Sequence, residues 1–183
     1  MQIHQLSISY DQVEDRLLVR LNTQDAQEYR FWFTRRMTLR LVPAMNQFLV
    51  RLEAAQPGVA ASDHNAQKIL ADIQRDAFLQ NADFATPYAA KAHLLPLGDE
   101  PMLVTDVQLK LQANGSLEVI FQKKIDEFIQ SCHLNLHAPL VHGFIHLLNE
   151  TLVKAEWEMS ALKLATDHAP EHTLAVDPVA YKH

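Results

Sequence analysis

Residues 104–162 are VTDVQLKLQANGSLEVIFQKKIDEFIQSCHLNLHAPLVHGFIHLLNETLVKAEWEMSAL. Asn114 and Gly115 lie between two runs in which apolar and polar residues alternate. Such a pair predicts a β-hairpin, because a type I′ turn needs positive φ at both central residues. Alternation places the apolar residues of each run on one face of a sheet. They are Val107, Leu109 and Leu111 before the turn, and Leu117, Val119 and Phe121 after it.

A third strand and a helix complete this unit. The apolar face of the third run carries Phe128, Cys132, Leu134 and Leu136. Pro139 suits the first position of a helix, where its missing N–H costs nothing. Apolar residues then recur at three- and four-residue steps as far as Leu162. This spacing predicts one amphipathic helix, about 40 Å long, lying on the apolar face of the strands.

The start of the chain repeats this pattern. Residues 3–34 hold three alternating runs with the apolar sets Leu6, Ile8, Tyr10; Leu17, Val19, Leu21; and Tyr29, Phe31, Phe33. Thr34 is a good N-cap for a helix that follows them. If Phe33 is aligned with Leu136, the two helical stripes coincide at a constant offset of 103 residues. The pattern predicts half-repeats at 3–53 and 103–165, a helical or loop connector at 54–102, and a mobile tail at 166–183.

The expected fold class is therefore α+β. Two pseudo-repeated βββα units form antiparallel sheet, as one sheet or two, with helices packed on one face, and residues 1–183 make a single domain. This layout resembles that of the duplicated Whirly and PUR families, and the resemblance implies single-stranded nucleic-acid binding. None of their motifs is present, so no functional residue is carried over. Residues 31–37 and 101–105, FWFTRRM and PMLVT, resemble uncharacterised proteobacterial proteins, which imply no activity.

Composition excludes several classes of protein. No run approaches 18 apolar residues, so no membrane span is expected. The N-terminus lacks the features of a signal peptide, which favours the cytoplasm. Cys132 is the single cysteine and is expected in the core, and four glycines provide no phosphate-binding loop. The net charge of −6 disfavours a dedicated duplex-DNA binder.

A row of polar residues on the second helix is a candidate metal site. His142 and His146 are four residues apart, and Glu150 follows one turn later. Two imidazoles and a carboxylate are suitable ligands for zinc or another divalent ion. The alternative interpretation is a solvated helix face, which the ten histidines of the chain make the more frequent case.

The polar side of the first sheet is a candidate for single-stranded nucleic-acid binding. Period 2 brings together Arg16, Arg20, Arg30 and Trp32, with Arg35 and Arg36 just beyond. Arginine beside an exposed aromatic ring tracks phosphates and stacks bases. The alternative is a solvated face whose arginines pair with Asp15, Asp25 and Glu28, with Trp32 covered by the middle helix.

Association is the third possibility and needs no special residue. An edge strand, a long helix and the expected exposure of Leu18, Trp32 and Ile120 would suit a dimer or a protein partner. No catalytic signature and no cofactor motif appear. The sequence therefore favours a non-catalytic cytoplasmic protein that acts through protein association as a scaffold or adaptor, most simply as a homo-oligomer.

Overall fold

The computed structural model of the chain describes residues 2–54, 69, 72–73, 76–78, 80, 86–89 and 94–157. Strands β1 (Ile3–Asp11), β2 (Arg16–Thr23) and β3 (Glu28–Thr34) precede helix α1 (Arg35–Ala54). The short strand β4 (Met102–Leu103) is followed by β5 (Asp106–Leu111), β6 (Leu117–Ile125), β7 (Phe128–Leu136) and helix α3 (Ala138–Lys154). The predicted α+β class is confirmed. Each half has the expected order of strands and helix, while the duplication itself stays a prediction.

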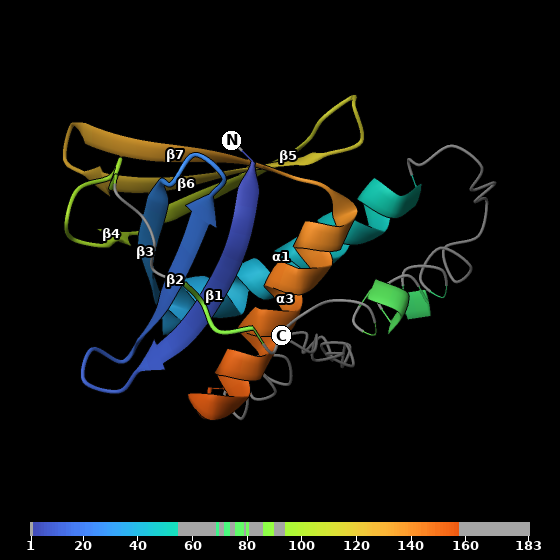
Figure 1. Cartoon of the computed structure of the whole chain (residues 1–183), viewed down its shortest axis with the longest axis horizontal. Helices are drawn as coiled ribbons and strands as arrows, with labels where there is room; N and C mark the ends of the chain where they lie inside the picture. Colours follow the sequence, from blue (N-terminus) through green and yellow to red (C-terminus); the bar gives the residue numbers. More distant parts are fainter. Residues whose placement is uncertain are drawn as a thin grey trace, which may run out of the picture.

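The strands form two sheets rather than one. Their orders are β1-β2-β3-β4 and β5-β6-β7, and all neighbours are antiparallel except β3 and β4. The chain passes directly from one sheet to the other. The Val104 N–H donates to the Trp32 carbonyl at 3.0 Å, and the Thr105 N–H donates to the Gln122 carbonyl at 2.8 Å. Residues 102–111 therefore join the two sheets, whose strands are steeply inclined to each other in Figure 1.

The two helices lie side by side and serve both sheets (Figure 1). Helix α1 contacts β3 and β5, and α3 contacts β7 and β1. Each open sheet has one apolar face that must be buried, and a shared helix pair covers both. Rings from both halves meet in this core, where the Phe121 centroid lies 5.0 Å from Phe31 and 5.2 Å from Phe33. The halves therefore share one core.

The predicted inner faces are confirmed. The fully buried residues include Leu17, Val19, Phe31, Phe33, Leu117, Val119 and Phe121, all at 0% exposure. The hairpin after β5 is also confirmed, but its predicted turn type is wrong. Of the two central residues, Gly115 has a positive φ, at 73°, and Asn114 does not. Asn114 contributes through its side chain instead, since its Oδ1 accepts a hydrogen bond from the Ser116 hydroxyl at 2.7 Å.

Helix α3 ends earlier than the predicted residue 162. The N–H groups of Glu156 and Trp157 donate to the carbonyls of Val153 and Leu152, and Glu156 has φ of 57°. This is a Schellman ending, in which a left-handed residue reverses the chain. The Trp157 side chain is thereby buried, and its Nε1 donates to Asp15 Oδ1 at 3.2 Å. The indole holds the end of α3 against the β1–β2 turn.

The middle and the end of the chain are described only in part. The predicted tail lies outside the described residues, and so does most of the predicted connector. Within the connector, residues 69, 72–73, 76–78 and 80 are helical. No helix among the described residues has both the length and the apolar character needed to cross a bilayer.

Candidate functional site

The outer face of the first sheet carries the predicted arginines. Arg20 lies opposite Arg30 across β2 and β3, and Leu18 lies opposite Trp32. Arg16 is at the other end of β2 and forms an ion pair with Glu14 at 3.4 Å. The structure thus brings Arg20, Arg30 and Trp32 onto one face. Arg35 and Arg36 begin α1, past the end of the sheet.

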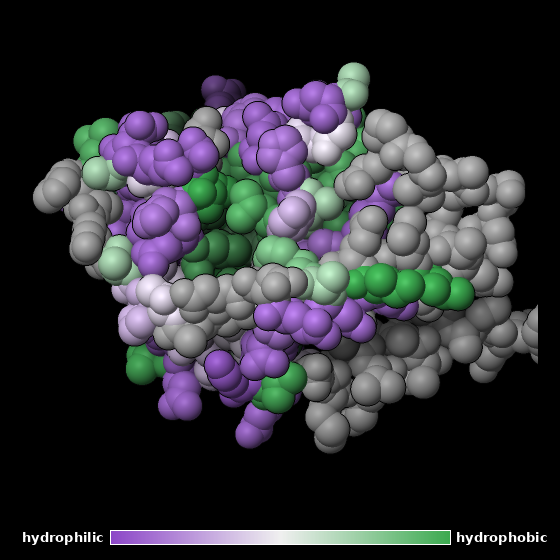
Figure 2. Space-filling model, turned by 45° about the vertical axis from the view of Figure 1, so that its right-hand side comes forward, coloured by the Kyte–Doolittle hydropathy of each residue, from purple (hydrophilic) through white to green (hydrophobic). Residues whose placement is uncertain are grey.

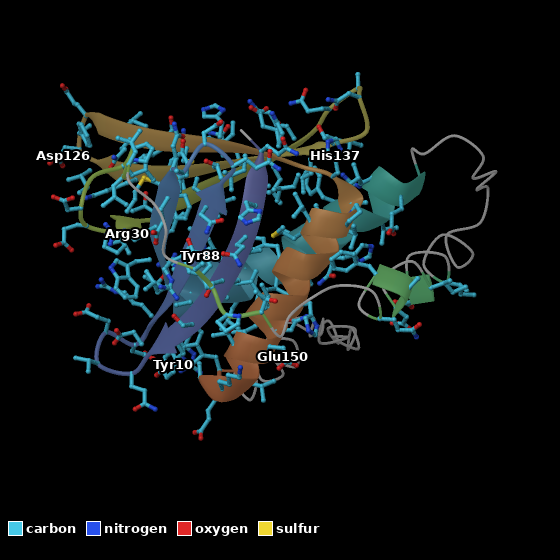
Figure 3. All side chains as sticks on the ribbon, in the orientation of Figure 1. Tyr10, Arg30, Tyr88, Asp126, His137 and Glu150 are labelled. Atoms are coloured by element: carbon cyan, nitrogen blue, oxygen red, sulfur yellow. The ribbon has the colours of Figure 1, made fainter. Side chains whose placement is uncertain are left out.

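Other parts of the chain contact this face. The Arg20 guanidinium carbon lies 4.6 Å from the centroid of the Tyr88 ring, and Arg30 donates to the Asp99 carbonyl. Residues 86–89 cross in front of the first sheet in Figure 1, and Figure 3 labels Tyr88 and Arg30 on this side. Asp15, one of the acidic residues of the alternative interpretation, accepts hydrogen bonds from Trp157 and Tyr10 through its Oδ1. Trp32 is half-buried.

Residues 86–89 are also fixed beside a pocket of about 560 Å³. Asn22 Nδ2 donates to the Ala89 carbonyl at 3.1 Å, and the Ala89 N–H donates to Gln5 Oε1 at 3.0 Å. Both side chains line the pocket, together with His4, Thr23 and Thr86. The pocket is the junction between the first sheet and this segment.

Tyr88 provides a direct check on this arrangement. Burial raises the pKa of Tyr88 to about 12, although the positive charges of Arg20 and Arg30 oppose the rise. We expect spectrophotometric titration to show one phenolate appearing near pH 12, and this step to be lost in Tyr88→Phe. In urea all tyrosines should titrate near their ordinary value of about 10. Because the fold favours the neutral phenol, this residue's contribution to stability should be lost as the pH rises from about 10 to about 12.

The predicted metal ligands are in unlike environments. His142 is buried rather than solvated, and its Nε2 lies 2.6 Å from Oε1 of Glu53, at the end of α1. His146 is half-buried and Glu150 is exposed. Among the described residues, no three His, Cys, Asp or Glu side chains are grouped closely enough to hold a metal ion. A helix-face pattern missed Glu53, which is 89 positions away in sequence.

The buried Glu53–His142 pair joins the two helices. The His142 ring stacks on Phe78 with centroids 6.1 Å apart, and an added Cβ at Gly143 would lie 3.4 Å from the same phenyl ring. Oε2 of Glu53 and Nδ1 of His142 are buried without a hydrogen-bond partner in the described structure. The pair is therefore a buried polar contact between α1 and α3.

The clearest exposed feature is the tip of the β6–β7 hairpin, here called the apolar tip. It consists of Ile125, Phe128 and Ile129, which are 52%, 62% and 58% exposed. Ile125 and Phe128 flank the turn as cross-strand neighbours. Figure 2 shows one face of the molecule, on which apolar atoms lie in a central recess and in a band to its right, with hydrophilic side chains around the recess. Three large apolar side chains at one hairpin end are a typical contact site for another protein.

Two other sequence expectations have clear outcomes. Cys132 is a core residue, as predicted, and burial raises the pKa of its thiol to about 12, which leaves it a poor nucleophile. The expected exposure of Ile120 is wrong, because this side chain at the centre of β6 is only 4% exposed. Its cross-strand neighbours are Gln108 and His133. Because β6 is the central strand of its sheet, Ile120 has a neighbouring residue on each side.

Comparison with protein-family models, with curated proteins and with solved structures found no match for this chain.

Proposed function

We propose that this chain is a cytoplasmic protein that acts through protein association, first of all with a second copy of itself. The observation that carries the proposal is the apolar tip, whose three side chains are all more than half exposed. Burying one such side chain contributes about 1.5–3 kcal/mol, so leaving three in water at one place favours a partner. The single thiol, Cys132, requires no oxidising compartment.

Single-stranded nucleic-acid binding has less support. Tyr88 lies on Arg20, and Asp99 accepts a hydrogen bond from Arg30, so the two neighbouring arginines of the outer face have contacts within the chain. A nucleic acid would have to displace both. The net charge of −6 adds a general repulsion.

Sedimentation of the full chain over a range of concentrations tests the association. We expect a reversible dimer in the wild type, and a dissociation constant at least roughly tenfold higher in Phe128→Ser, because the variant exposes no ring for the partner to cover. Val13→Ser is the matched control, since Val13 is 94% exposed on the β1–β2 turn and lies outside the apolar tip. A wild-type chain that stays monomeric at hundreds of micromolar would refute the proposal.

A further inference from the structure

We propose that the second copy binds along β7, and that the two β7 strands pair antiparallel about a two-fold axis. This inference rests on the proposed self-association and specifies its geometry. In Figure 1, β7 runs along the top of the molecule, and it pairs only with β6 among the described strands. It is a nine-residue strand, and its other edge pairs with no strand among the described residues.

The four edge strands differ in how well they are protected against pairing. Natural edges are blunted by short length, charged side chains or bulges. Strand β4 has two residues, β5 carries Lys110 and Asp106, and the β1 pairing is irregular between Ile3 and Gln5. Strand β7 has none of these features: it is long, regularly paired with β6, and free of Lys, Arg, Asp, Glu and Pro. Among the four described edge strands it is therefore the one with the least protection against pairing.

The hairpin turn determines which backbone groups face outward. Ile125 and Phe128 flank a two-residue turn, and such flanking residues form a hydrogen-bonded pair. Because hydrogen-bonded pairs alternate, the even-numbered residues of β7 bond to β6. The N–H and C=O groups of the odd-numbered residues therefore point to the free edge. These are Ile129, Ser131, His133 and Asn135.

An axis through Cys132 uses the whole strand and pairs the odd-numbered residues with one another. In this register Phe128 lies opposite the partner's Leu136. Leu136 borders an apolar seam between β1 and β7 that is also lined by Ile3, Leu6 and Leu140. An exposed ring at one end of the strand thus meets an apolar seam at the other, and the two-fold axis makes each contact twice.

Charge also favours this register. If this register is continued past Phe128 into the hairpin turn, Glu127 and Asp126 lie beside the start of the partner's α3. Helix α3 has no acidic residue in its first turn and no side-chain cap from His137. The N-terminus of a helix carries a partial positive charge, so an acidic turn stabilises it. Figure 3 shows Asp126 and His137 at opposite ends of β7, as the pairing requires.

The size of the contact sets the expected affinity. Stable dimers usually bury roughly 1,200 Å² or more, and one strand pair with two aromatic contacts is at the low end of that range. We therefore expect a dissociation constant on the order of micromolar, which sedimentation measures directly.

Ser131→Pro tests the pairing, because proline removes an outward N–H while the bonds to β6 remain. The symmetric contact loses this donor twice, so the dissociation constant should rise roughly tenfold or more. Ser131→Thr keeps the N–H and is the control, with circular dichroism confirming that both variants fold. In the wild type, hydrogen exchange at the odd-numbered amides of β7 should slow as concentration rises, while amides of β5 should not change.

The outcomes separate the two proposals. A monomeric wild type refutes self-association and the pairing together. A wild type that dimerises, with Ser131→Pro dimerising equally well and no protection at β7, leaves self-association intact and refutes the pairing. Loss of the dimer in Ser131→Pro but not in Ser131→Thr, with protection of Ser131 and His133 amides, supports both.

Discussion

Phe121→Ala is expected to lower the free energy of unfolding by about 3–5 kcal/mol. Phe121 is fully buried, and its ring packs edge-to-face on Phe31 and Phe33 and lies 6.4 Å from Phe144. The substitution therefore leaves a cavity where both sheets and α3 meet. Urea denaturation measures the loss, and against a typical total of roughly 5–15 kcal/mol it is a large fraction.

Phe128→Ala is the matched control. It is the same substitution in the same sheet, at a side chain that is 62% exposed, so the loss in a monomeric sample should be within about 0.5 kcal/mol. The shape of the transition matters as well. Because the remaining core residues of the two halves form one cluster, Phe121→Ala should still unfold in one step. If fluorescence of Trp32 and Trp157 reported two separate transitions, the halves would be independent and the shared core would be wrong.

The strands could be predicted because their signal is local. Alternation fixes which face of a strand is apolar, and Leu117, Val119 and Phe121 are all fully buried as expected. The N-cap of α1 is equally local, and the Met37 N–H does donate to Thr34 Oγ1 at 3.3 Å. These features depend on residues within a few positions of one another.

The arrangement of the helices could not be predicted because it depends on distant residues. Periodicity shows that a helix needs an apolar surface, but not which sheet provides it, and here α1 reaches β5 while α3 reaches β1. The end of α3 is similar. Glu156 adopts a left-handed φ without being glycine, because Trp157 gains burial and a hydrogen bond to Asp15. That partner is 142 positions away.

The sequence prediction of the candidate sites was incomplete for the same reason, because their contacts come from residues that are distant in sequence. Helical spacing grouped His142 with His146 and Glu150, whereas the contact at 2.6 Å is to Glu53 on the other helix. Period 2 correctly placed Arg20 beside Arg30, but it carries no information about Tyr88 lying on top. The apolar tip had a local signal, since Ile125, Phe128 and Ile129 surround a charged turn. Its exposure was not predicted, because apolar residues in strands are expected to be buried.

Removing one member of the Glu53–His142 pair should lower the free energy of unfolding nearly as much as Phe121→Ala does. In Glu53→Leu, the His142 ring stays buried without its hydrogen-bond partner. In His142→Leu, the Glu53 side chain stays buried without its partner. Removing one member of a buried pair costs about 3–5 kcal/mol, because the other keeps its desolvation penalty. The double variant removes both polar groups and fills the space with apolar atoms, so we expect it within about 1 kcal/mol of the wild type. Urea denaturation of the four proteins at pH 7 gives the coupling free energy.

Comparing the stability loss of the double variant with the sum of the two single losses shows whether Glu53 and His142 are coupled. Glu150→Leu is the control for the substitution itself, since Glu150 is an exposed carboxylate on the same helix and should change stability by about 0.5 kcal/mol or less. If the double variant lost the sum of the single losses, Glu53 and His142 would not be coupled, and each would contribute through other contacts. If it recovers, the pair's main role is to specify how α1 docks on α3 rather than to add stability. A leucine pair could then pack in more than one register, and loss of sharp aromatic signals in the proton spectrum of the double variant would report that freedom.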